Sequence, residues 1–147
     1  MRLLISGLVC LLLYGCGGPG DSPEDEVRRW LADAQSAVET EDRGTLISML
    51  ADNYVDARGN DRNAIDQTLR FWFLRQDSIV LVSNIEDIVI SGETAALVTL
   101  TAGMAGSNDS AFGFSADAYR FELELENDGD DWLLVAARWG ELGDKVR

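Results

Sequence analysis

The stretch YRFELELENDGDDWLLVAARW, residues 119–139, decides the fold of this chain. Its first half alternates between apolar and charged side chains, which predicts a strand with one buried face and one wet face. The expected inward set is Tyr119, Phe121, Leu123 and Leu125. A turn signal at 127–130 contains the Asp-Gly pair that tolerates positive φ, and a second apolar run follows from Trp132 to Trp139. The stretch therefore predicts an antiparallel hairpin.

The second strand of this hairpin is apolar on both faces. Strict alternation places Trp132, Leu134 and Ala136 on one face, the face we also expect for Arg138. It places four others on the opposite face: Leu133, Val135, Ala137 and Trp139. One layer of helices cannot cover both faces of a sheet. Either the sheet curls strongly over itself, or its outer face meets another subunit as in a homodimer, and the pattern leaves both open.

Two further strands precede this hairpin. Their patterns predict Ile79 to Ile90 and Thr94 to Ala102, joined by the compact turn Ser91-Gly92-Glu93. The four strands together predict an antiparallel meander. The connection from Gly103 to Ala116 is rich in Gly and Ser. Its apolar residues, Met104, Phe112 and Phe114, either cover a pocket opening or tuck back onto the sheet.

The first half of the domain predicts helices. Ser22-Pro23-Glu24-Asp25 supplies an N-cap, a proline at the first helical position and acids in the first turn, and an apolar stripe continues to about Thr40. Asp42 can cap a short second helix. We expect a brief strand over Asn53 to Arg58, with Tyr54, Asp56 and Arg58 on one face. A third helix should run from Arg62 to Leu74, facing the core with four residues: Ile65, Leu69, Trp72 and Phe73.

The first residues resemble a bacterial lipoprotein signal. Arg2 precedes an apolar segment over residues 3–13 that is too short to cross a bilayer, and Leu13-Tyr14-Gly15-Cys16 resembles the lipidation motif. We expect a signal peptide at 1–15, a lipidated tether at 16–22, one domain at 23–142 and a tail at 143–147. The resemblance implies acyl chains on Cys16 that hold the protein at the cell envelope, with the outer membrane facing the periplasm favoured over the inner membrane. An ordinary signal peptide cleaved near Gly18 is the alternative.

Composition narrows the classes of function. The chain has 12 basic and 26 acidic residues, a net charge of −14, which disfavours a nucleic-acid partner. It has no histidine, so the commonest general base and the usual zinc ligand are absent. The acids at Asp128, Asp130 and Asp131 lack the ligand spacing of a calcium loop and favour turn chemistry. We expect neither a metal nor a cofactor.

The order of elements resembles the nuclear-transport-factor-2-like superfamily, including the SnoaL-like proteins. The resemblance covers about Pro23 to Leu142 and rests on weak pieces in a persuasive order: Asp42-Arg43-Gly44-Thr45-Leu46, Tyr54-Val55-Asp56, Ser91-Gly92-Glu93-Thr94-Ala95 and Asp131-Trp132-Leu133-Leu134. It implies an α+β cone. Three N-terminal helices pack in a curved antiparallel sheet of four long strands plus one short strand, often around an apolar pocket and often as a dimer.

The candidate site residues follow from that cone. The expected pocket is lined by five residues: Trp30, Tyr54, Trp72, Phe73 and Phe121. Asp56, with Tyr54 or Tyr119, is the candidate for acid–base catalysis, and Asp117 and Arg138 could join it. The alternative is structural: Asp56 and Arg58 form a pair at the end of a strand, and Arg138 pairs with Glu122 and Glu124 across the sheet.

Three functions remain open from the sequence. The first is a non-catalytic, lipid-anchored envelope domain that binds a small apolar ligand or an envelope protein. The second is an isomerase, dehydratase or hydrolase that uses Asp56. The third is an architectural subunit of an envelope complex.

Overall fold

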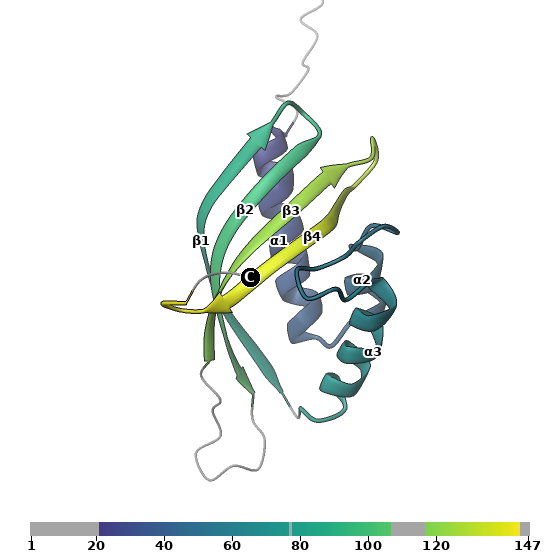
Figure 1. Ribbon diagram of the computed structural model, residues 1–147, viewed down its shortest axis with the longest axis vertical. Helices are drawn as coiled ribbons and strands as arrows, with labels where there is room; N and C mark the ends of the chain where they lie inside the picture. The colour runs from purple at the N-terminus through teal and green to yellow at the C-terminus, as the bar shows by residue number, and fades with distance from the viewer. Residues whose placement is uncertain (1–20, 77, 107–116, 145–147) are drawn as a thin grey trace, which may run out of the picture.

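A four-stranded antiparallel sheet curves around a helical layer in the computed structural model, which describes residues 21–76, 78–106 and 117–144 (Figure 1). The helices are α1 (Pro23–Glu39), α2 (Arg43–Ser48) and α3 (Arg62–Phe73). The strands are β1 (Ile79–Ser91), β2 (Ala95–Gly106), β3 (Asp117–Asn127) and β4 (Trp132–Glu141). The sheet order β1-β2-β3-β4 confirms the predicted meander.

Side-chain caps fix the helix starts, and the sequence predicts two of them, at Ser22 and Asp42. Ser22 forms a reciprocal capping box with Asp25: the Ser22 Oγ accepts from the Asp25 N–H at 3.2 Å, and the Asp25 carboxylate accepts from the Ser22 N–H at 3.3 Å. The Asp42 carboxylate accepts from the Thr45 N–H at 3.0 Å, and Asp61 caps α3 in the same way. The side-chain hydrogen bond from Ser22 is the main cause of a lowered pKa at Asp25.

Two β-bulges bend the sheet. Ile85 and Asp87 of β1 pair with the adjacent residues Leu100 and Thr99 of β2, so Glu86 has no opposite residue in this ladder. Leu134 and Ala136 of β4 pair with the adjacent residues Leu125 and Glu124 of β3, so Val135 has no opposite residue in that ladder. An extra residue bends its strand and reverses which side chains face inward beyond it. The bulges therefore let both outer strands place apolar residues on the concave face on either side of the bulge.

The bulge at Val135 corrects the prediction of strict alternation in β4. Trp132 and Leu134 are buried before the bulge, and Ala137 is buried after it. Trp139 then lines the cavity on the concave face. The prediction that Arg138 shares the face of Trp132 and Leu134 is wrong, because the bulge turns its side chain to the outer face.

The outer face of the sheet is largely charged at its centre. Arg138 pairs with Glu122 at 2.9 Å, the structural role that the sequence favours for it. Glu86 accepts from Arg120 at 2.8 Å and from Thr101. Toward β1 the face becomes apolar, where Val82 is 68% exposed. A subunit contact on this face stays a prediction.

The segment over Asn53 to Arg58 does not form the predicted fifth strand. It makes an isolated bridge, Val55 to Asp61, and lies against β4 through irregular bonds: Ala57 N–H donates to the Ala137 carbonyl at 3.0 Å. The Asp56 side chain folds the chain into a turn at this point, and a turn cannot continue a ladder.

Several predicted features lie outside the described residues. These are the signal-like segment with Cys16, and Phe112 and Phe114 of the β2–β3 connection. β2 continues to Gly106, so that connection begins later than predicted. Among the described residues, no helix is both long enough and apolar enough to cross a membrane.

Candidate ligand-binding pocket

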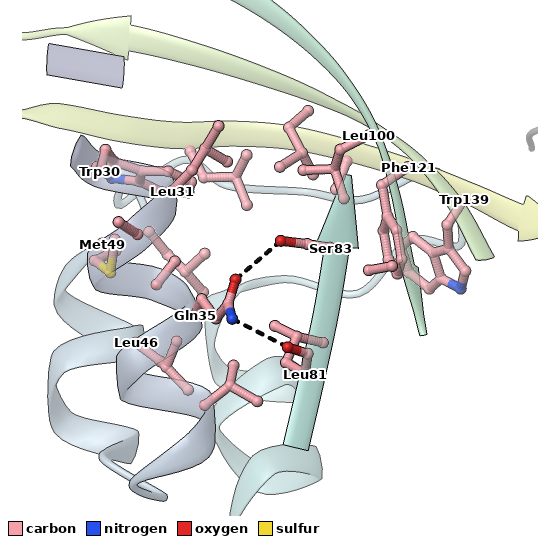
Figure 2. Close-up of a pocket in the computed structure, with 18 of the residues that line it drawn as sticks. Trp30, Leu31, Gln35, Leu46, Met49, Leu81, Ser83, Leu100, Phe121 and Trp139 are labelled. Carbon is pink, nitrogen blue, oxygen red and sulfur yellow. Dashed lines mark hydrogen bonds between the residues drawn. The ribbon is translucent and has the colours of Figure 1, made fainter. Parts of the chain in front are cut away.

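A cavity of about 490 Å³ opens between the helices and the concave face of the sheet (Figure 2). α1 contributes Trp30, Leu31, Ala34, Gln35 and Val38 to its lining. The sheet contributes residues from every strand, among them Leu81, Leu100, Phe121 and Trp139. Alternation explains these positions, since Leu100 and Ala102 point inward from β2 and Phe121 and Leu123 from β3. The core is thus hollow where the sheet curves away from α1.

Stacked rings form one wall of the cavity. The rings of Phe121 and Trp139 lie 6.4 Å apart with an interplanar angle of 26°. The Arg58 guanidinium lies 4.5 Å from the centroid of the Trp139 ring. A cation over an indole face is attracted by the ring quadrupole, so Arg58 helps to hold the Trp139 ring in place.

A polar pair interrupts the apolar lining between α1 and β1. The Gln35 Nε2 donates to the Leu81 carbonyl at 3.0 Å, and the Ser83 Oγ donates to the Gln35 Oε1 at 2.9 Å. Figure 2 shows Gln35 reaching from the helix toward both residues on the strand. Glu39 accepts from the Leu81 N–H at 3.0 Å, one turn further along α1. These bonds join the helix to the edge strand at the rim of the cavity.

Tyr54 lines the cavity as predicted and is only 3% exposed. Burial, with a smaller contribution from the nearby Asp56 carboxylate, raises the pKa of the Tyr54 phenol to about 12. The hydroxyl therefore stays neutral across the physiological range. Tyr54 therefore contributes an uncharged polar group to the residues that line the cavity.

Asp56 is buried but is not among the residues that line the cavity. Its Oδ1 accepts from the backbone N–H groups of Arg58 and Asn60, each at 2.9 Å, and its Oδ2 accepts from the Asn60 Nδ2 at 2.9 Å. Three donors on one carboxylate hold a tight turn. This geometry favours a structural role over proton transfer.

The other predicted site residues divide between the cavity and its surroundings. Trp30 and Phe121 line the cavity, as predicted. Trp72 and Phe73 do not; their rings pack on each other with centroids 5.4 Å apart. Tyr119 lies beside Phe121, with centroids 6.4 Å apart, and is not among the lining residues. The Asp117 side chain is outside the described part of the chain.

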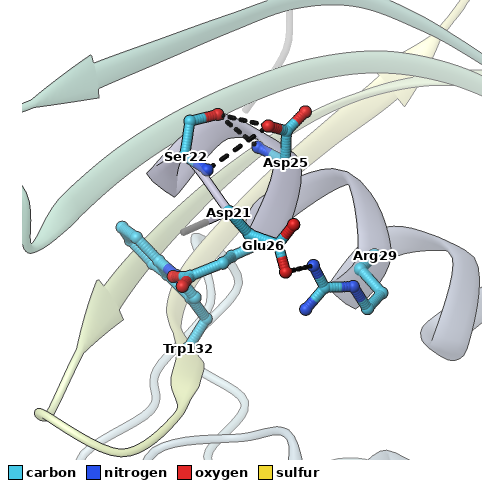
Figure 3. Close-up of polar contacts among 6 residues, drawn as sticks. All are labelled: Asp21, Ser22, Asp25, Glu26, Arg29 and Trp132. Carbon is cyan, nitrogen blue, oxygen red and sulfur yellow. Dashed lines mark hydrogen bonds and ion pairs between the residues drawn. The ribbon is translucent and has the colours of Figure 1, made fainter. Parts of the chain in front are cut away.

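A second cleft lies between α1, α2 and the β3–β4 turn and is polar. Its lining includes Glu26, whose carboxylate accepts from the Trp132 indole N–H at 2.9 Å (Figure 3). Asp128 folds the adjoining turn by accepting from the N–H groups of Asp130 and Asp131, which is the turn chemistry expected from the sequence. In the part of the chain that the structure describes, no cluster of acids has the arrangement of a metal site.

Comparison with solved structures identifies the fold. A ketosteroid isomerase-like protein from Erwinia carotovora atroseptica is 11% identical, with a TM-score of 0.64 over 81% of this chain and 95% of that chain. A protein from Streptomyces avermitilis assigned to the NTF2-like family is 13% identical, with a TM-score of 0.69 over 81% and 96%. Bd1075 of Bdellovibrio bacteriovorus is 12% identical, with a TM-score of 0.69, and the chain spans only 40% of its length.

These likenesses show that the described domain has the nuclear-transport-factor-2-like fold that the sequence resembles. At such low identity they carry the fold and not the function. No family model matches the sequence, and no curated protein matches it.

The sequence did not indicate Gln35 and Ser83 as pocket residues. Gln35 lies beside Ala34 on a helix that its apolar stripe predicts. Ser83 lies in a strand that its apolar residues predict. Their hydrogen bond joins positions 48 residues apart, which no local pattern contains. The only available signal was a polar side chain at a position of the buried stripe.

Proposed function

We propose that this protein is a non-catalytic binding protein that takes up a small, uncharged, apolar molecule in the cavity between α1 and the sheet. The observation that carries the proposal is the open cavity of about 490 Å³ with an almost wholly apolar lining. A pocket of this size and chemistry is typical of small-molecule sites. The fold supports a ligand-binding or enzyme-like domain in general, and the choice between the two rests on the polar groups.

The polar groups around the cavity favour binding over catalysis. The Asp56 carboxylate is held by three donors in a turn and lies outside the lining. The Tyr54 phenol is held neutral by burial. A general acid or base works best with a pKa near the operating pH and within reach of the substrate. Asp56 is out of reach because it does not line the cavity, and the raised pKa of Tyr54 lies far from the operating pH.

The lipoprotein-like first residues of the chain suggest where in the cell this binding protein is located. Acyl chains on Cys16 would anchor the domain at the cell envelope, and the net charge of −14 would keep its body away from anionic headgroups. The cavity would then face an aqueous compartment next to a membrane, where apolar small molecules partition. Mass spectrometry of the mature protein tests the lipid on Cys16.

Binding of N-phenyl-1-naphthylamine, an uncharged apolar fluorophore, tests the proposed function. We expect saturable binding with one site per chain and quenching of tryptophan emission, because Trp30 and Trp139 line the cavity. Ala34→Phe places a ring in the empty space and should abolish binding. Ser36→Phe, on the exposed side of the same helix, is the matched control and should bind normally. Binding that Ala34→Phe leaves intact would refute the assignment of the site.

A further inference from the structure

We propose that the cavity is specific for a neutral amphiphile that ends in a hydroxyl group, and that Gln35 and Ser83 bind that hydroxyl at the rim. This inference rests on the proposed function, because it assigns the chemical class of the molecule that the same cavity takes up.

The lining excludes charged head groups. Among the described lining residues only Arg28 carries a charge, and no lining residue is a carboxylate. Arg28 is half exposed and already pairs with Glu24 at 2.8 Å on the outside of α1. At the rim a charged head group gains no counter-ion among the lining residues that the structure describes, apart from the already paired Arg28, and the nearby Glu39 carboxylate is engaged with the Leu81 N–H. Further inside the cavity, a carboxylate or an ammonium group would lose its water without gaining a buried partner, which is unfavourable for either sign of charge.

The orientation of the Gln35 amide follows from its partners. The Leu81 carbonyl can only accept, so the Gln35 Nε2 must face it, at 3.0 Å. The Gln35 Oε1 must then face Ser83, whose hydroxyl donates its proton to it at 2.9 Å. The bond to the acceptor-only Leu81 carbonyl fixes the amide, which cannot turn over without losing that bond.

This arrangement leaves one N–H donor on Gln35 and unused acceptor lone pairs on the Ser83 hydroxyl and the Gln35 Oε1. An amide nitrogen carries two N–H bonds, and the bond to Leu81 uses one of them. A hydroxyl oxygen has two lone pairs, and Ser83 uses only its proton in the bond to Gln35. A ligand group that both accepts and donates satisfies the donor and one acceptor together. A hydroxyl does so, whereas a ketone only accepts.

The position of the pair sets the direction of the ligand. Ser83 is exposed, so the polar pair lies at the rim, between α1 and the edge strand β1. The rings of Phe121 and Trp139 and the side chain of Leu100 lie across the cavity from Gln35 (Figure 2). The apolar body of the ligand therefore points toward the aromatic wall, and its hydroxyl stays at the opening.

Competition among ten-carbon probes tests the specificity. Bound N-phenyl-1-naphthylamine is displaced by 1-decanol, 2-decanone, decanoate or decylammonium, each kept below the concentration at which it aggregates. We expect 1-decanol to compete best, 2-decanone to be about three- to tenfold weaker because one hydrogen bond is lost, and both ions to be weaker still. Decanoate or decylammonium competing as well as 1-decanol would overturn the inference.

Variants at the rim separate the polar pair from general apolar binding. Gln35→Met keeps the length of the side chain, and Ser83→Ala removes only the hydroxyl. Each should bring the affinity for 1-decanol, measured relative to the affinity for the fluorophore in the same variant, down to that for 2-decanone. Ser36→Ala, beside Gln35 on the exposed side of α1, should change neither probe. An unchanged preference for 1-decanol in both rim variants would overturn the inference.

The two proposals fail in different ways. If the fluorophore does not bind the folded wild-type protein, the proposed function itself fails. If it binds and the decyl probes displace it without regard to their head groups, only the specificity fails.

Discussion

Replacement of Asp56 distinguishes its structural role from a catalytic one. Asp56→Ala removes the acceptor of three hydrogen bonds, each 2.9 Å long, and leaves the N–H groups of Arg58 and Asn60 in a partly buried turn. A hydrogen bond to a charged group contributes about 1.5–3 kcal/mol, and bonds that share one acceptor are not additive. Water can reach Arg58, which is exposed, and replaces part of the loss. We therefore expect the free energy of unfolding to fall by about 2–4 kcal/mol.

Asp56→Asn is the matched comparison. Its amide oxygen can still accept from the two backbone N–H groups, and only the bond from the Asn60 side chain has to rearrange. We expect a loss of about 1 kcal/mol and fluorophore binding like that of the wild type, because Asp56 does not line the cavity.

Urea unfolding followed by tryptophan fluorescence measures both losses. An Asp56→Ala protein as stable as the wild type would refute the structural role. A stable Asp56→Asn protein that loses an activity of the wild type would instead assign catalysis to the carboxylate.

Four further changes have defined outcomes. Because the folded-state pKa of Tyr54, about 12, lies above its ordinary value of 10.0, its contribution to stability is complete below pH 10 and is lost as the pH rises through 12. Between pH 10 and pH 12, the free energy of unfolding measured with urea should therefore fall more steeply for the wild type than for Tyr54→Phe. Parallel pH dependences of the two proteins would contradict this. Ser22→Ala opens the capping box with Asp25 and should lower the unfolding free energy by about 1 kcal/mol, seen as a lower Tm, whereas no change would mean that the box is not populated. Deletion of Val135 removes the bulge and should leave Ala137 and Trp139 on the concave face, because Leu134 and Ala136 already pair with the adjacent residues Leu125 and Glu124. The deletion protein should therefore still bind the fluorophore, and loss of binding by a folded deletion protein would contradict this. Cys16→Ser should move the protein from the membrane fraction to the soluble fraction, and membrane retention without lipid would contradict the anchor.

The sequence predicts the helices and the inner strands well because their signals are local. Ser22, Asp42 and Asp61 mark helix starts through bonds that reach only three residues. β3 alternates without interruption over its predicted inward residues, since its register on β2 is continuous. The faces predicted for β4 are wrong beyond Val135, because the bulge there is set by pairing with β3 and leaves no mark in the local composition.

The site was less predictable for a related reason. Tyr54, Trp30 and Phe121 line the cavity because large rings on inward positions converge in a closed fold. Trp72 and Phe73 belong to the same class of residue, but their rings pack on each other outside the cavity lining. Asp56 drew attention as a buried acid, and the structure explains its burial by a turn.

The two bulges also determine where the chain tolerates a change of length. Glu86 and Val135 stand on the flanking strands β1 and β4, whereas the ladder between β2 and β3 runs without a shift. A codon inserted in a flanking strand disturbs one ladder of this meander, and a bulge already present there can migrate to absorb it. The same codon in β2 or β3 has to reset the ladders on both sides at once. Insertions and deletions in proteins that descend from this domain should therefore accumulate in β1 and β4. There they change the rim of the cavity, whereas β2 and β3 keep their length.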